Sequence, residues 1–69
     1  MHDSFVIANG RQVAAPLPCS IERFLELQKL PSRSVVVEHN GKAVAPSEFN
    51  QLQLSAGDRL EIVTIVAGG

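Results

Sequence analysis

Hydrophobic and polar positions divide the chain into short segments that end at proline, glycine or asparagine. The first apolar run covers residues 5–8, is rich in strand-forming side chains and ends at Asn9-Gly10. Both residues of an Asn-Gly pair accept the positive φ angles of a type I′ turn, so residues 12–15 are expected to return as a second strand. The pattern therefore predicts a β-hairpin over residues 4–15.

One amphipathic helix is expected after this hairpin. Pro16 and Pro18 begin a loop, and the hydroxyl of Ser20 can accept hydrogen bonds from the amides of a first helical turn. Residues 21–30 then carry apolar side chains at helical spacing, and Pro31 is expected to end the helix. The predicted helix has about three turns, and its stripe positions are Ile21, Phe24, Leu25 and Gln28.

Two strands joined by a tight turn are predicted next. Residues 34–38 are mostly β-branched, which favours a strand. A second Asn-Gly pair, Asn40-Gly41, predicts another type I′ turn. Residues 42–45 then return as a short strand that ends at Pro46.

The last strand is predicted to be the longest. Residues 47–54 are mixed in character and are expected to form a loop with a short helical turn, which Ser47 could cap. A turn at residues 56–58 precedes residues 59–66, the most β-prone run of the chain.

These elements follow the order β-β-α-β-β-β, which predicts an α+β fold with one main helix packed on a mixed sheet. The last strand is expected to be central and beside the first strand, because it is the most hydrophobic. Residues 1–66 are predicted to form a single domain, and residues 67–69 a flexible reactive tail at the C-terminus.

Side chains on the last strand should alternate between the two faces of the sheet. Three are expected to face the helix: Leu60, Ile62 and Thr64. Three are expected to face away from it: Glu61, Val63 and Ile65. Val63 and Ile65, beside one outward residue of the 35–37 run, would then form an exposed apolar patch, which in a small domain is more often a docking surface. The alternative is a second layer of core, if both faces of the sheet are covered.

Composition and charge exclude several classes of function. With 45% hydrophobic and 19% charged residues, the chain is too apolar and too weakly charged to be intrinsically disordered. A net charge of −1 and the absence of Trp and Tyr argue against a nucleic-acid partner. No apolar run reaches the length of a membrane span, so a cytoplasmic location without a membrane partner is expected.

Other reactive side chains are interpreted as structural. Cys19 is the single cysteine, which excludes an intramolecular disulfide and fits a reducing compartment; a small, partly buried side chain is favoured over a reactive thiol. His2 and His39 have too few companions for a metal site. Glu22 and Glu26 are expected on a solvated helix face, and Glu22 in the first turn with Lys29 in the last turn suits the helix dipole.

The order of elements, the two Asn-Gly hairpins and the terminal Gly68-Gly69 together resemble the ubiquitin-like sulfur carriers, and most of all the thiamine-biosynthesis sulfur carrier family. The similarity lies in Asn9-Gly10-Arg11, in residues 37–44 and above all in residues 56–69. In that last block a Gly-Asp turn and a hydrophobic strand lead into Gly-Gly. The resemblance implies the β-grasp (ubiquitin-like) fold.

The resemblance also implies a reaction cycle centred on Gly69. An adenylating activating enzyme uses ATP to activate the Gly69 carboxylate, and a persulfide on a donor protein supplies sulfur. The resulting thiocarboxylate then donates its sulfur to thiazole synthase, so the chain is a protein cosubstrate with no bound cofactor and is not an enzyme. Gly68 and Ala67 give the tail access to its partners, because glycine lets two backbones approach closely, and Glu61, Val63 and Ile65 are the expected docking residues.

Three other functions remain open from the sequence. The small subunit of molybdopterin synthase has the same tail chemistry, but such subunits are usually longer and tend to carry aromatic and proline residues before the Gly-Gly, where this chain has residues 63–67. A ubiquitin-like modifier would form isopeptide bonds through the same glycines. A plain interaction module would have no tail chemistry.

Overall fold

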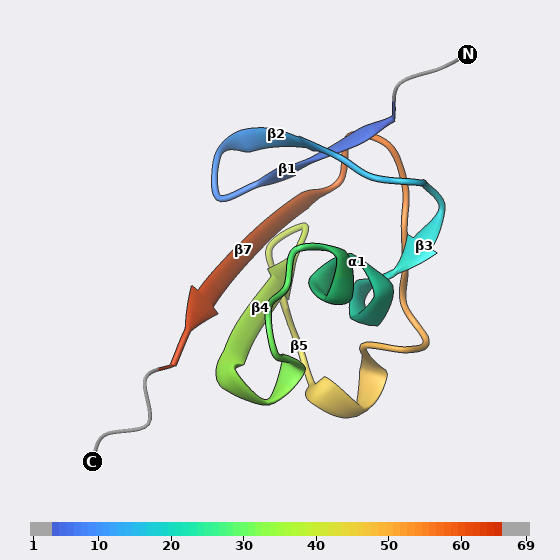
Figure 1. Ribbon diagram of the computed structural model, residues 1–69. Coiled ribbons are helices and arrows are strands. Elements are labelled where there is room, and N and C mark those ends of the chain that lie inside the picture. Colours follow the sequence, from blue (N-terminus) through green and yellow to red (C-terminus); the bar gives the residue numbers. More distant parts are fainter. Residues whose placement is uncertain (1–3, 66–69) are drawn as a thin grey trace.

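The structure is a computed structural model that describes residues 4–65 (Figure 1). Within these residues, seven strands, one α-helix and two short 3-10 helices follow one another: β1 (Phe5–Ala8), β2 (Arg11–Ala14), β3 (Cys19–Ser20), α1 (Ile21–Leu27), η1 (Ser32–Ser34), β4 (Val35–His39), β5 (Lys42–Val44), η2 (Pro46–Glu48), β6 (Gln53–Leu54) and β7 (Arg59–Thr64).

Five of the strands form one mixed sheet in the order β2-β1-β7-β4-β5. The last strand, β7, is central, parallel to β1 and antiparallel to β4. The predicted position of the last strand beside the first is therefore confirmed. The main helix, α1, packs on one face of this sheet, which confirms the predicted α+β architecture (Figure 1).

A second sheet of two short strands was not expected from the sequence. In it β3 pairs antiparallel with β6, with Cys19 opposite Leu54 and Ser20 opposite Gln53. Each strand has only two residues, which is too short to show the alternation that reveals a strand in a sequence.

The start of α1 confirms the predicted cap. The amide of Arg23 donates to the Ser20 hydroxyl over 3.0 Å. Two more first-turn amides, of Ile21 and Glu22, donate to backbone carbonyls of Leu52 and Phe49 over 3.1 and 2.9 Å. The loop before β6 therefore satisfies helix amides that have no partner within the helix.

The end of α1 differs from the prediction. The helix stops at Leu27, and Lys29 has a φ of 60°. The amides of Lys29 and Leu30 donate to the carbonyls of Glu26 and Leu25, which is the pairing of a Schellman motif. The expected three turns to residue 30 are therefore wrong, and Lys29 lies beyond the last turn because its left-handed backbone closes the helix before Pro31.

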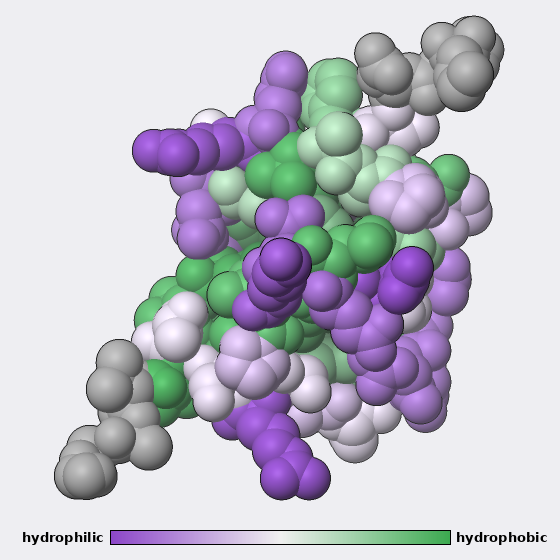
Figure 2. All heavy atoms as spheres, viewed as in Figure 1, coloured by the Kyte–Doolittle hydropathy of each residue, from purple (hydrophilic) through white to green (hydrophobic). Residues whose placement is uncertain are grey.

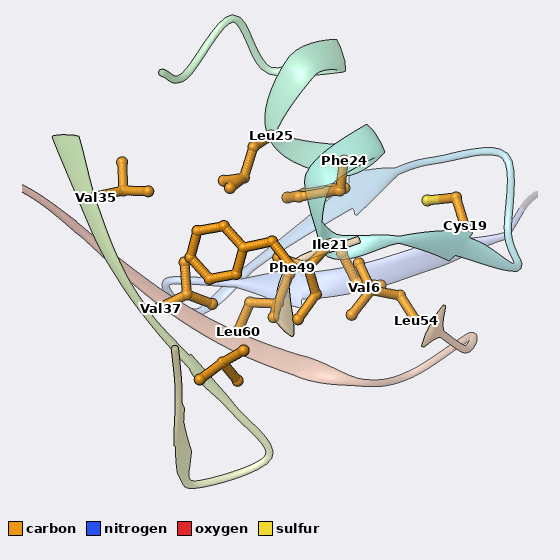
Figure 3. Packing of buried hydrophobic residues seen from close by; sticks show 11 residues of the cluster. Val6, Cys19, Ile21, Phe24, Leu25, Val35, Val37, Phe49, Leu54 and Leu60 are labelled. Carbon is orange, nitrogen blue, oxygen red and sulfur yellow. The ribbon is translucent and has the colours of Figure 1, made fainter. Parts of the chain in front are cut away.

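The core lies between α1 and the sheet (Figure 3). Phe49 sits in the middle of it, against side chains from both layers, although the sequence predicts a loop with a short helical turn there. The buried cluster comprises Val6, Cys19, Ile21, Phe24, Leu25, Val35, Val37, Val44, Phe49, Leu54 and Leu60.

The loop that carries Phe49 begins with the 3-10 helix η2. Ser47, proposed above as its cap, lies inside η2 and does not cap it. Instead the Glu48 carboxylate accepts a hydrogen bond of 3.1 Å from the amide of Ala45. The prediction for Ser47 is wrong because η2 begins one residue earlier, at Pro46, which needs no amide partner in a first turn.

Both Asn-Gly pairs form the predicted tight turns. Asn9 and Gly10 have φ angles of 51° and 80°, and Asn40 and Gly41 have 52° and 87°. Positive φ at both central residues defines the type I′ turn, which matches the twist of the flanking strands. The turns therefore set the registers of the β1–β2 and β4–β5 hairpins.

Candidate functional site

The residue expected to react, Gly69, and the two tail-access residues, Ala67 and Gly68, lie outside the described residues. The part of the site that the structure shows is the strand that leads to them, β7, together with the sheet face around it. The residues predicted for docking, Glu61, Val63 and Ile65, all lie in this part.

Neighbours hold β7 on both sides. Along β4 the pairing runs from His39 opposite Leu60 to Val35 opposite Thr64. Beyond the last pair, the Ile65 amide still donates to the Ser34 carbonyl over 2.6 Å. This edge of β7 is therefore fixed as far as the last described residue.

On its other edge β7 pairs with β1, which is shorter. The ladder has only Ile7 opposite Arg59 and Ala8 opposite Leu60. The Asn9 side chain continues it: its Oδ1 accepts from the Ile62 amide over 2.7 Å, and its Nδ2 donates to the Ile62 carbonyl over 3.0 Å. A side-chain amide thus takes the place of one more residue of β1.

The side chains of β7 divide between the two faces much as the alternation predicts. Leu60 is fully buried, and Ile62 packs against the core. Thr64 is exposed and does not belong to this cluster, but as the cross-strand partner of a buried residue it lies on the predicted face of the sheet. It lies at the last position of β7, opposite Val35.

The opposite face, which we call the open face, carries Val36, Glu38, Glu61, Val63 and Ile65. Val63 is 62% exposed, Ile65 52% and Val36 48%. Val36 and Val63 are direct partners across β4 and β7, so Val36 is the outward residue expected from the 35–37 run. Figure 2 shows hydrophobic surface along β7 toward its end.

Two carboxylates lie beside this apolar pair. Glu38 on β4 is the direct partner of Glu61 on β7, and both are exposed. Glu61 was expected on this face, whereas Glu38 was not singled out. Alternation from Val36 would have placed Glu38 there, but its partner on β7 depends on a strand register that the sequence does not state.

At the start of β7 a polar cluster joins the β4–β5 turn to the turn before β7. Nε2 of His39 donates to Oδ2 of Asp58 over 2.8 Å, and the amide of Ser55 donates to the same oxygen over 2.9 Å. Burial alone would raise the pKa of Asp58, but hydrogen bonds from His39, Ser55 and Asn40 and the charge of His39 bring it below its usual value. His39, the last residue of β4, therefore has a structural partner, in line with its interpretation as a structural side chain.

The structure also shows the surroundings of the other side chains that could react. Cys19 is buried, and this burial raises the pKa of its thiol despite the opposing charge of Arg23. Glu22 is exposed, and Glu26 forms an exposed ion pair with Arg23 at 3.3 Å. His2 lies outside the described residues.

Residues 4–65 contain no group of three side chains placed to bind a metal ion. Within the same residues, no helix is both long enough and apolar enough to span a membrane.

Comparisons with known proteins agree with the sequence resemblance. Residues 4–69 match the model of the ThiS family. A curated protein described as thiazole synthase, from Paramagnetospirillum magneticum, is 33% identical over 64 residues, which are 93% of this chain and 20% of the relative. The chain thus spans about a fifth of the length of the curated relative that it matches.

Among solved structures, the crystal structure of the thiamine biosynthesis protein (ThiS) from Geobacter metallireducens has the same fold. Its TM-score is 0.79 at 22% identity, and the match covers 94% of this chain and 99% of that chain. The fold, the element order and the family match over nearly the whole chain lead to one conclusion. The chain belongs to the ThiS family.

Proposed function

We propose that this chain carries sulfur for thiamine biosynthesis and delivers it to a thiazole synthase. The observation that carries this proposal is the family match, which includes Gly68 and Gly69. The curated relative supports the acceptor, because there a similar segment is part of a longer chain described as thiazole synthase. Joining a carrier to its acceptor raises their effective concentration.

The reacting group in this proposal is the carboxylate of Gly69. A terminal carboxylate is ionised at neutral pH, since its usual pKa is about 3.5, and it is a poor acyl electrophile. An activating enzyme uses ATP to join this carboxylate to AMP as a mixed anhydride, with release of pyrophosphate. The chain is then a cosubstrate of that enzyme.

Sulfur enters in the next step. A persulfide on a donor protein attacks the Gly69 carbonyl carbon and displaces AMP, because a thiolate-type sulfur is an effective nucleophile near neutral pH. A thiol then attacks the donor's sulfur atom and forms a disulfide with it, which breaks the bond to the transferred sulfur and leaves a thiocarboxylate on Gly69. The small residues Ala67 and Gly68 allow the tail to enter a narrow site, since little or no side chain hinders the backbone.

The role of β7 in this proposal is to present the tail. Its backbone is hydrogen-bonded on both edges, by β4 and by β1 with Asn9. Val63 and Ile65, next to the tail, are more than half exposed. We assign partner docking to them and to Glu61, so that the partner binds the sheet while the glycines reach its reactive centre.

Loading of Gly69 is tested by intact mass spectrometry. The chain is incubated with an activating enzyme, ATP and a persulfide donor, and the expected product has one oxygen replaced by sulfur. Gly69→Ala is expected to abolish loading while leaving the thermal unfolding curve unchanged. The control Ser47→Ala, at an exposed position of η2, should load like the original chain. A normally loaded Gly69→Ala protein would contradict the proposal.

The same measurement separates the alternatives. A covalent adduct with another protein would indicate a ubiquitin-like modifier, and an unchanged mass would indicate an interaction module. Deletion of the gene then distinguishes the acceptors: thiamine auxotrophy supports thiazole synthase, whereas loss of molybdopterin with normal thiamine supports molybdopterin synthase.

A further inference from the structure

We propose, on the basis of the function above, that the open face binds an arginine of the thiazole synthase between Glu38 and Glu61, while apolar side chains of the same partner cover Val36 and Val63. The inference rests on the two carboxylates of the open face, because a partner surface that fits against them must supply positive charge.

The two carboxylates oppose each other in the free protein. Glu38 and Glu61 are direct cross-strand partners, and the Cβ atoms of such partners are about 5 Å apart. Like charges directly opposite each other destabilise a sheet. The pair thus costs stability in the absence of a partner.

No ion pair within residues 4–65 neutralises these two carboxylates, although Arg59 lies two residues before Glu61 on the same strand. On β5 the partner of Glu38 is Ala43. On the other side β1 ends at Ala8, opposite Leu60, before it reaches Glu61. Among residues 4–65 the ion pairs are Arg23–Glu26 and His39–Asp58, and neither involves these two carboxylates.

A guanidinium group fits this site better than an ammonium group. Arginine is planar and presents five N–H donors in a fixed fork, so that one side chain can donate to two carboxylates at once. A cation placed there also removes the repulsion between Glu38 and Glu61. Binding therefore gains from relief of a strain that the free carrier bears.

The apolar part of the open face fixes the direction of docking. Val36 and Val63 lie two residues along their strands from Glu38 and Glu61, which is about 7 Å. The valines are on the side of the C-terminal end of β7, and the carboxylates are on the side of its start. A partner that matches both must place its apolar contact toward the tail and its arginine away from it.

Covering the valines also strengthens the charged contact. Apolar side chains over Val36 and Val63 exclude water from the neighbouring carboxylates, and charge-assisted hydrogen bonds are stronger where water is excluded. Salt still weakens part of the attraction between the arginine and the glutamates, because it screens charges that are more than about 8 Å apart at physiological ionic strength.

The test measures binding of the full-length chain to thiazole synthase from the same organism at two salt concentrations. Glu38→Gln and Glu61→Gln are each expected to weaken binding about tenfold and to reduce its dependence on salt. The double variant should lose less than the product of the single effects, because both carboxylates bind one cation. Glu22→Gln, on the exposed surface of α1, is the control and should bind like the original chain.

Thermal unfolding gives a second readout. Neither glutamine variant should be less stable than the original chain, because each removes the repulsion. Unchanged affinity in both variants, or affinity that rises, would overturn the inference, as would a loss of stability in both. The loading of Gly69 is measured separately with the activating enzyme, so normal loading with unchanged affinity would reject the arginine site and leave the sulfur-carrier function standing.

Discussion

The asparagine side chains of the two tight turns do more than allow positive φ angles. Asn9 hydrogen-bonds to both backbone groups of Ile62, and Oδ1 of Asn40 accepts from the Arg59 amide over 2.8 Å. Each turn therefore also binds the central strand β7. The sequence predicts the turns, because Asn-Gly is a local signal. It cannot predict these side-chain bonds, since their partners are 53 and 19 residues away.

Asp58 should make the stability of the fold depend on pH. Its pKa is lower in the folded protein than usual, so its ionised form stabilises the fold. This contribution is complete above the unfolded pKa of about 3.9 and is lost as the pH falls through the lower, folded pKa. Asp58→Asn should therefore reduce the free energy of unfolding by about 2 kcal/mol at pH 7.

Urea unfolding at a series of pH values checks this expectation. The difference between the original chain and Asp58→Asn should shrink as the pH falls below about 4. A difference that stays constant between neutral and acid pH would show that the charge of Asp58 does not stabilise the fold.

At the scale of elements, local sequence signals are sufficient to predict the start of α1 but not its end. Ser20 and the apolar spacing correctly place the start of α1, because both signals are local. Its end depends on Lys29, whose left-handed backbone (φ 60°) is one that glycine adopts far more readily than lysine. The strands β3 and β6 were missed for a related reason, since each is defined only by its pairing with the other.

Lys29→Gly should stabilise the protein. Glycine relieves a left-handed conformation that costs other residues about 1–2 kcal/mol, and it loses part of this gain through its greater freedom in the unfolded chain. We expect a net increase of about 1 kcal/mol in the free energy of unfolding, measured by urea denaturation. The control Gln28→Gly, at a φ of −85°, should be destabilising, and a destabilised Lys29→Gly would contradict this account of the helix end.

At the scale of the whole molecule, the sheet has one face toward the core and one open face. The order of the main elements and the outward direction of Val63 and Ile65 follow from periodicity and are confirmed. The place of Phe49 at the centre of the core does not follow, because an apolar residue within a mixed loop has no periodicity to indicate its direction. The pairing of Glu38 with Glu61 likewise depends on tertiary register.

Two neighbouring valines on β4 test whether one face of the sheet is buried and the other is open. Val37 is fully buried and Val36 is 48% exposed. Val37→Thr should lower the free energy of unfolding by about 2 kcal/mol, because it buries a hydroxyl group, whereas Val36→Thr should change it by less than about 0.5 kcal/mol. Equal losses in the two variants, measured by urea denaturation, would show that the open face is covered within the molecule.

The position of β7 between two neighbours also determines how the domain bears a mechanical load. A partner that pulls on the C-terminal end draws β7 along its own length, across the direction of its hydrogen bonds to β1 and β4. Such a pull loads the bonds of both ladders together in shear and does not open them one after another. The bonds from Asn9 to Ile62 then act as an additional anchor near the loaded end, so that pulling β7 out of the sheet requires these hydrogen bonds to break together.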